Sequence, residues 1–310
     1  HSCGSCFGTE RLSSMQWYNY EEENVTGMQK PFWWLTNGVL AGVLAIFGVL
    51  FFWQEQKQTT FEVVFLDIGQ GDAILIQDGE TQVLIDGGRD GLELLSRLGR
   101  YVPFWDRNLE VVIATHPDSD HIGGLPSVLR NYQVDTVMTN GQVGDTETSK
   151  LFEELASQKA KTRLTVAEGT EILFPAGATL RFLYPLTPIP ADSPIETNEG
   201  SLVARLDFFD SSFLFTGDLA REEEALQDIQ PVDILKVAHH GSRFSTSDQF
   251  LDVLKPKEAV VSVGENSYGH PHPDVLMNLK ERGIRTYRTD EEGDIFYRCD
   301  KETKQCLKRE

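Results

Sequence analysis

Residues 111–124 read VVIATHPDSDHIGG, and this stretch decides how the rest of the chain is interpreted. The apolar run at 111–114 is typical of a buried strand, and it leads directly into His116, Asp118, Asp120 and His121. Side chains in a loop at a strand end can lie on both sides of one point, so two metal ions can share them. A chance cluster in a polar loop is the alternative. The strand before the cluster and the glycine pair at 123–124 favour metal ligation.

The segments on either side of this stretch predict the fold class. The runs FEVVFLDIG, AILIQDG and TQVLIDGG, within residues 61–88, have the β-branched and turn residues of three consecutive strands. Strands outnumber helices over residues 61–310, although AREEEALQDI at 220–229 is expected to be an acidic helix. This pattern predicts an α/β domain in which two sheets pack face to face with helices outside, an αββα four-layer sandwich.

The HxDxDH cluster resembles the HxHxDH signature of the metallo-β-lactamase superfamily, with Asp118 at the place of the second histidine. The variant HPDSDHIGG at 116–124 is similar to the form found in the hydrolase domain of the DNA-uptake protein ComEC. The similarity continues in order through most of residues 61–290. We expect a free-standing relative of that domain, because the chain has one candidate membrane segment where ComEC has a multi-helix channel.

The resemblance implies roles for residues along the whole domain. Asp218, in FTGD at 215–218, would bridge two metals, and AHHGS at 238–242 would supply the last ligand, for which we favour His240 over His239. The implied metal ligands are therefore His116, Asp118, Asp120, His121, Asp218 and His240. Asp86 would support the metal loop, and Asn198 falls where other members of the superfamily have a histidine.

A second set of residues is expected to act on the substrate. Asp120 would orient the nucleophile, a role that Asp218 shares as an alternative, and one of His239, His240, His270 and His272 would protonate the leaving oxygen. A rigid surface loop is the alternative interpretation of GHPHP at 269–273. Lys236, Ser242 and Ser245 would either bind a phosphate oxygen or be ordinary neighbours of the site.

The donor set predicts two divalent metal ions. Carboxylates at Asp118, Asp120 and Asp218 in place of imidazoles move the preference from Zn²⁺ towards Mn²⁺, and both ions stay open. Two ions held together would activate a water molecule for attack on an ester or phosphodiester.

The N-terminal part of the chain predicts a membrane anchor. No residue from 31 to 53 is charged, and tryptophans 33, 34 and 53 lie at its ends, as in the aromatic belts of membrane helices. At about 1.5 Å per residue this length matches a hydrocarbon core of roughly 30 Å. We therefore expect a polar tail at 1–30, a single transmembrane helix at 31–53, a linker at 54–60 and the hydrolase domain at 61–310.

The cysteines leave two questions open. Cys299 and Cys306 flank a polar stretch that is typical of a hairpin tip, so a disulfide and two free thiols are both possible. A disulfide would place the domain outside the cytoplasm. Cys3 and Cys6 are expected to lie in a tail without function.

The net charge bears on the substrate. The formal net charge is −20, and most of it lies beyond residue 58. An acidic surface repels polyanions, although Arg221, Arg243, Lys236, Lys255 and Lys257 could form a local basic track. The resemblance predicts DNA as the substrate of a phosphodiesterase or nuclease. The charge favours the alternative of a phosphodiester or ester at the cell surface, and a catalytically silent binding module is a third possibility.

Overall fold

The computed structural model of the protein describes residues 37–49, 60–226 and 229–309. Contacts divide the chain into two units, residues 1–53 and 54–310. Within the first unit, residues 37–49 are helical, while the other residues of the expected span at 31–53 lie outside the described part. None of the described helices has both the length and the apolar character needed to cross a membrane.

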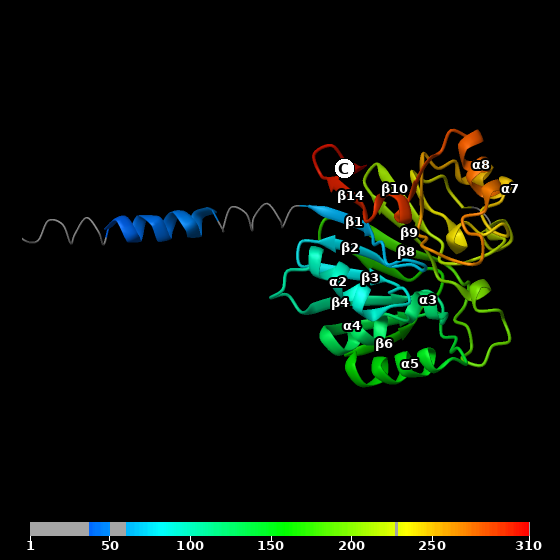
Figure 1. The fold of residues 1–310 in the computed structure, drawn as a ribbon, viewed down its shortest axis with the longest axis horizontal. Coiled ribbons are helices and arrows are strands. Elements are labelled where there is room, and N and C mark those ends of the chain that lie inside the picture. The colour runs from blue at the N-terminus through cyan, green and yellow to red at the C-terminus, as the bar shows by residue number, and fades with distance from the viewer. Residues whose placement is uncertain (1–36, 50–59, 227–228, 310) are drawn as a thin grey trace, which may run out of the picture. The chain divides into compact units, whose positions relative to one another are not determined.

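The second unit contains two sheets, as expected from the sequence (Figure 1). The first sheet is antiparallel from β15 to β3 and parallel from β3 to β6. In spatial order it contains β15 (Gln305–Lys308), β14 (Ile295–Asp300), β1 (Phe61–Phe65), β2 (Ile74–Asp78), β3 (Thr81–Ile85), β4 (Asn108–Ala114), β5 (Gln133–Thr139) and β6 (Thr162–Thr165). The second sheet contains β13 (Arg285–Arg288), β12 (Glu258–Val261), β11 (Ile234–Lys236), β10 (Ser211–Phe215), β9 (Val203–Phe208), β8 (Thr179–Tyr184) and β7 (Glu171–Leu173).

The inner faces of the two sheets form one apolar core. Strand β1 alternates, so that Phe61 and Phe65 point between the sheets while Val64 points to the helices on the outside. The ring of Phe61 stacks on Phe208 of β9 at 5.1 Å between centroids, and Phe65 lies 6.1 Å from Phe215 of β10. Aromatic pairs of this kind join the sheets by burying large apolar area.

Helices cover both outer faces, as Figure 1 shows. On the first sheet lie α2 (Gly91–Tyr101), α3 (Ser119–Ile122), α4 (Leu125–Asn131) and α5 (Glu147–Lys159), and their apolar residues form one cluster with that sheet. On the second lie α6 (Glu222–Ala225), α7 (Asp248–Leu254) and α8 (Pro273–Glu281), and α9 (Thr289–Glu292) follows β13. The three apolar clusters confirm the predicted αββα layering.

The acidic helix expected at 220–229 is shorter in the structure. Helix α6 ends at Ala225, and residues 227–228 lie outside the described part. The side chain of Glu222 is buried, and both of its carboxylate oxygens accept the backbone N–H of Thr246. The first glutamate of the acidic run is therefore fixed inside the domain.

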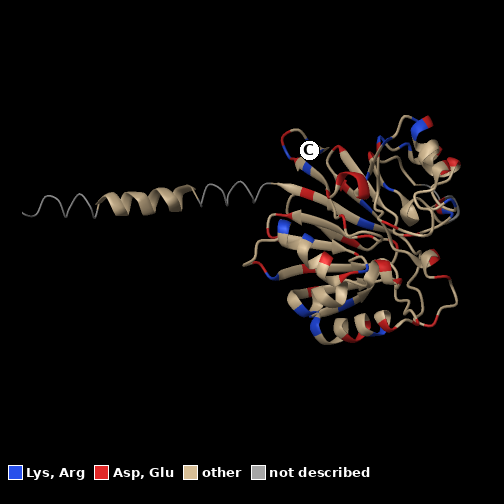
Figure 2. Ribbon diagram, in the orientation of Figure 1, with Lys and Arg blue, Asp and Glu red and all other residues tan. Residues whose placement is uncertain are grey.

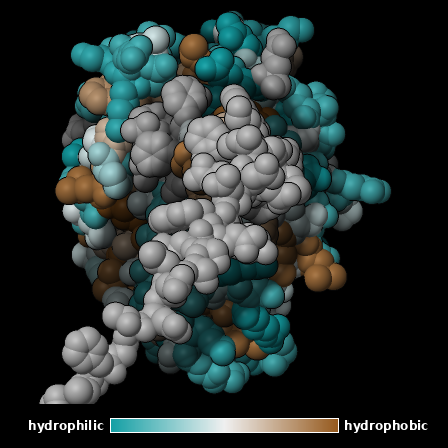
Figure 3. Space-filling view, turned by 90° about the vertical axis from the view of Figure 1, so that its left-hand side faces the viewer, coloured by the Kyte–Doolittle hydropathy of each residue, from teal (hydrophilic) through white to brown (hydrophobic). Residues whose placement is uncertain are grey.

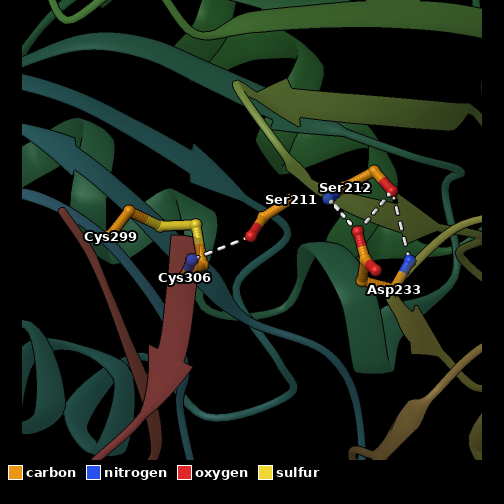
Figure 4. Close-up of a disulfide and its surroundings, with 5 residues drawn as sticks. All are labelled: Ser211, Ser212, Asp233, Cys299 and Cys306. Atoms are coloured by element: carbon orange, nitrogen blue, oxygen red, sulfur yellow. Dashed lines mark hydrogen bonds between the residues drawn. A yellow bond between two sulfur atoms is a disulfide. The ribbon is translucent and has the colours of Figure 1, made fainter. Parts of the chain in front are cut away.

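The C-terminal hairpin carries a disulfide between Cys299 of β14 and Cys306 of β15 (Figure 4). The two cysteines are paired across the strands, which confirms the first of the two alternatives for them. The backbone N–H of Cys306 donates to the hydroxyl of Ser211 at 2.8 Å. Because Ser211 begins β10, this bond ties the edge of the first sheet to the second sheet.

Charged residues lie throughout the second unit, and Figure 2 shows carboxylates on strands, helices and loops alike. On the face shown in Figure 3, hydrophilic residues predominate in the coloured surface and apolar residues appear in separate patches. Exposed apolar side chains such as Leu92, Phe104 and Leu173 come from different elements of the domain.

Candidate metal centre

The site begins where β4 ends at Ala114. The chain passes through Thr115 to Pro117 and enters α3, whose N-cap is Asp118. His116 and His121 are buried, whereas the side chains of Asp118 and Asp120 keep 39% and 19% of their surface exposed. The turn from β4 into α3 thus buries two imidazoles and leaves two carboxylates in reach of solvent.

Asp86 fixes the orientation of His121. It follows β3 in the left-handed region at φ 57°, and its carboxylate accepts the N–H and the hydroxyl of Thr115 at 2.8 and 2.7 Å. The same carboxylate lies 2.8 Å from Nδ1 of His121. A carboxylate on one imidazole nitrogen directs the other nitrogen towards a metal, so Nε2 of His121 is the atom available for ligation. This placement agrees with the supporting role expected for Asp86.

Asp218 lies between two histidines. One of its carboxylate oxygens is 3.2 Å from Nε2 of His121, and the other is 3.3 Å from Nε2 of His240. Burial alone would raise the pKa of Asp218, but the two imidazoles hold it well below its usual value. Asp218 thus lies between two imidazoles of the expected ligand set, and its bridging role stays a prediction.

The turn after β11 places its two histidines differently. His239, His240 and Gly241 are consecutive left-handed residues, a conformation that costs on the order of 1–3 kcal/mol at each non-glycine position. His240 is buried, with Nδ1 2.9 Å from the carbonyl of Ser262 and Nε2 3.7 Å from Asp120. His239 lies nearer the surface, with Nε2 3.3 Å from the amide of Asn198. The structure therefore places His240 deeper, and puts Asn198 beside His239.

The donor atoms fit a divalent metal. Nε2 of His116, His121 and His240 is buried in each case, without a well-aligned hydrogen bond to any described residue. Three sets of donor atoms among the described residues each lie within 4.8 Å of one another: His116, His121 and Asp218; Asp120, His121 and His240; and Asp72, Asp86 and His121. Buried imidazoles without partners are costly unless they bind a cation or a proton. Asp118 lies outside these sets, although its carboxylate is 3.8 Å from Nε2 of His116.

The rim of the site carries the HPHP segment. The ring of His270 is 5.4 Å from that of His239, and the backbone N–H of His272 donates to the carbonyl of Gly241. His272 is the N-cap of α8, where its Nδ1 accepts the N–H of Asp274. Burial lowers the pKa of both His239 and His270, so the neutral imidazole is favoured at the rim. Of the two histidines in the segment, His270 lies against His239 and His272 caps a helix.

The three expected phosphate-binding candidates have partners inside the domain. Ser245 donates its hydroxyl proton to the carbonyls of Ala238 and Ser242, and the hydroxyl of Ser242 accepts the N–H of Phe244. Lys236 is fully buried, with Nζ 3.1 Å from the carbonyl of Gly217 and 2.5 Å from Asp72. These contacts favour the alternative that all three are structural neighbours of the centre.

Comparison with known proteins identifies the family. The profile of the metallo-beta-lactamase superfamily matches residues 66–265. The chain belongs to the metallo-beta-lactamase superfamily. Members of this superfamily are generally metal-dependent hydrolases, and their fold implies bound divalent metal ions.

Two curated relatives support the family assignment, and a solved structure supports the fold. ComE operon protein 3 of Bacillus subtilis is 34% identical over 261 residues, 76% of this chain and 33% of that protein. Recombination protein 2 of Haemophilus influenzae is 31% identical over 266 residues, 82% of this chain and 30% of that protein. The metallo-beta-lactamase fold protein YhfI from Bacillus subtilis superimposes with a TM-score of 0.54 over 77% of this chain and 99% of that one, at 15% identity.

The resemblance to ComEC-type proteins is thereby confirmed. The chain spans about a third of the length of the curated relatives it matches. The similarity to YhfI shows the fold alone.

One residue of this metallo-beta-lactamase centre was absent from the expected site. Asp72 is buried, and its carboxylate contacts Lys236 and lies 3.5 Å from Nδ1 of His240 and 3.9 Å from Nδ1 of His121. It follows the turn Gly69–Gly71 in FLDIGQGDAILI, within the part of the chain that resembles the family. The sequence signal that could have identified Asp72 is a carboxylate that follows two glycines and directly precedes an apolar strand.

Proposed function

We propose that the chain is a metal-dependent phosphodiesterase that cleaves DNA, and that residues 31–53 anchor it to a membrane. The observation that carries the catalytic part is the convergence of three buried Nε2 atoms, of His116, His121 and His240, around Asp218 and Asp120. Two divalent cations, when bound there, supply an activated water and charge stabilisation at the phosphate. The name of one relative, Recombination protein 2 of Haemophilus influenzae, supports DNA as the substrate.

The residues of the chain divide the work. His116, Asp118, Asp120, His121, Asp218 and His240 hold the cations, which we expect to be Mn²⁺ or Zn²⁺. Asp86 and Asp72 lie on the Nδ1 side of His121 and His240, respectively, and so orient the Nε2 atoms of these imidazoles towards the cations. His239 and His270 lie at the rim, and we assign to one of them the transfer of a proton to the leaving oxygen; because burial favours the neutral imidazole, that histidine must first take up a proton from solvent.

A second candidate function has one observation in its favour. The net charge of −20 opposes a polyanion, and of the expected basic residues Lys236 is buried while Lys257 pairs with Asp233 at 2.7 Å. A phosphodiester or ester at the cell surface would be an uncharged or singly charged substrate that such a surface repels less.

The test is cleavage of linear single- and double-stranded DNA by the purified chain with added Mn²⁺ or Zn²⁺, beside an Asp120→Ala variant. Metal-dependent cutting that the variant lacks supports the nuclease. Turnover of bis(4-nitrophenyl) phosphate without any cutting of DNA supports the second candidate. Full cutting by Asp120→Ala would contradict the proposed centre.

We propose further that the domain lies outside the cytoplasm. A bond between Cys299 and Cys306 is stable in an oxidising compartment, which supports a domain outside the cytoplasm. Cells are treated with N-ethylmaleimide before lysis, and the peptides that contain the two cysteines are analysed by mass spectrometry. Peptides joined by a disulfide support this location, and two maleimide adducts contradict it.

A further inference from the structure

Aromatic rings form a continuous row from the buried centre to the solvent. Successive ring centroids are 4.1, 5.4, 6.3, 5.4 and 5.9 Å apart through His116, His121, His240, His239, His270 and Tyr268. The inner rings are buried, and Tyr268 is 65% exposed. An aromatic side chain with this exposure, next to a rim histidine, offers a flat apolar face at the rim of the site.

The loop that carries Tyr268 is held in place by one amide side chain. Nδ2 of Asn266 donates to the carbonyls of Gly264 and His270 at 2.9 and 2.8 Å. Its Oδ1 accepts the N–H groups of Tyr268 and His270, both at 3.1 Å. The side chain of Asn266 thus fixes the backbone on both sides of the exposed tyrosine.

The same loop is also fixed at its base. A side chain at Gly264 would overlap the backbone of Gly69 and Gln70, so the loop packs directly on the turn that precedes Asp72. The N–H of Gly264 donates to Oε1 of Gln70 at 3.4 Å. The loop that carries the exposed ring is therefore already ordered before a ligand binds. Less conformational entropy is lost when a ligand stacks on the ring, so the entropic cost of binding is lower.

We propose that Tyr268 is a stacking platform for a nucleobase next to the scissile phosphodiester, and that the substrate is single-stranded; this rests on the proposed function. Stacking on aromatic side chains is how proteins hold single strands without regard to sequence. The stacking energy comes from the face of the base and not from the phosphate charge, so it adds affinity in a domain whose net charge repels polyanions. In a duplex the bases stack on one another and must be unpaired before they reach the ring.

The test compares cleavage of a short oligothymidylate with inhibition by an abasic oligomer of the same length. The abasic oligomer keeps the phosphates and lacks the bases. In Tyr268→Ala we expect KM for the oligothymidylate to rise about 5-fold to about 150-fold, the range for one lost stacked base. The inhibition constant of the abasic oligomer should change less than KM, because that oligomer has no base to stack.

Two variants serve as controls. Tyr268→Phe keeps the ring and should retain the KM of the wild-type chain for oligothymidylate. Phe104→Ala removes a ring that is 78% exposed, in the loop before β4 and therefore at the opposite end of that strand from the site. It should leave both constants unchanged.

The outcomes separate the two proposals. If the wild type cleaves oligothymidylate and Tyr268→Ala leaves its KM unchanged, or raises both constants equally, the stacking platform is overturned while the nuclease stands. If the wild type cleaves neither DNA nor bis(4-nitrophenyl) phosphate with added metal, the proposed function fails, and the platform fails with it.

Discussion

Nζ of Lys236 lies 2.5 Å from Oδ2 of Asp72, and both side chains are buried behind the metal centre. Nζ is also 3.8 Å from Asp218. The lysine therefore places a positive charge within a group of carboxylates that includes the bridging candidate. Without it, the buried carboxylates would repel one another at close range in a medium of low dielectric.

The first prediction concerns this ion pair. Lys236→Met should lower the free energy of unfolding by about 3–5 kcal/mol, because it leaves Asp72 as a buried charge without its partner. The measurement is urea unfolding in the presence of a chelator. The double variant Lys236→Met/Asp72→Leu should recover part of the loss. Additive losses in the double variant would show that the two side chains do not depend on each other.

The second prediction concerns the turn before Asp72. Gly69 and Gly71 both have positive φ, at 74° and 128°. A side chain at Gly71 would overlap the backbone carbonyl of Asp120, whereas one at Gly69 would meet no atom within 4 Å. Gly69→Ala should therefore cost about 1–2 kcal/mol of strain alone. Gly71→Ala should in addition displace Asp120 and so reduce the number of metal ions bound per chain. This metal content is measured by elemental analysis after dialysis. Equal metal content in the two variants would contradict this role of Gly71.

How far the sequence predicts this centre depends on how close its residues are to one another along the chain. His116, Asp118, Asp120 and His121 are adjacent in the chain, so one strand end suffices to bring them together. The short runs of β-branched and other apolar residues in β1 and β4 likewise predict buried strands from local sequence alone, and the layering was inferred from the order of such runs and the helical stretches between them.

The parts that were not predicted depend on contacts between distant segments. Asp72 and Lys236 are 164 positions apart by their residue numbers and meet only because β2 and β11 lie in facing sheets. The left-handed backbone at His239 and His240 has no local sequence signal except the glycine that follows. This backbone decides which of the two imidazoles is buried, so the sequence favours His240 as the ligand without establishing it. The buried contact of Glu222 with Thr246 joins residues that are 24 positions apart, so the acidic run alone gives no signal for it.

The third prediction concerns alkaline pH. The hydroxyl of Tyr297 donates to Glu258 at 2.9 Å, and burial together with this carboxylate raises the pKa of Tyr297 well above its ordinary value of 10.0. Above that ordinary value the unfolded chain loses the tyrosine proton and the folded chain keeps it. The contribution of Tyr297 to stability is therefore complete below about pH 10 and is lost as pH rises further.

Tyr297→Phe removes this proton from both states. Between about pH 10 and about pH 11, the free energy of unfolding of the wild type should fall more steeply than that of the variant, by up to about 1.4 kcal/mol per pH unit. Urea unfolding of both proteins over this range gives the two slopes. Parallel slopes would mean that the hydroxyl titrates alike in the folded and unfolded chains.

The last prediction separates metal binding from stability. Asp86→Ala leaves the N–H and hydroxyl of Thr115 and Nδ1 of His121 without their acceptor, so it should destabilise the fold and lower metal affinity about 10- to 100-fold. Asp90→Ala is the matched control, because Asp90 lies four residues further on and its carboxylate caps α2 through the N–H groups of Leu92 and Glu93. It should cost about 1 kcal/mol and leave metal affinity intact. Metal affinities are measured by competition with a chromophoric chelator. If Asp86→Ala binds metal as tightly as Asp90→Ala, the imidazole of His121 keeps its orientation without the carboxylate, and the support assigned to Asp86 is wrong.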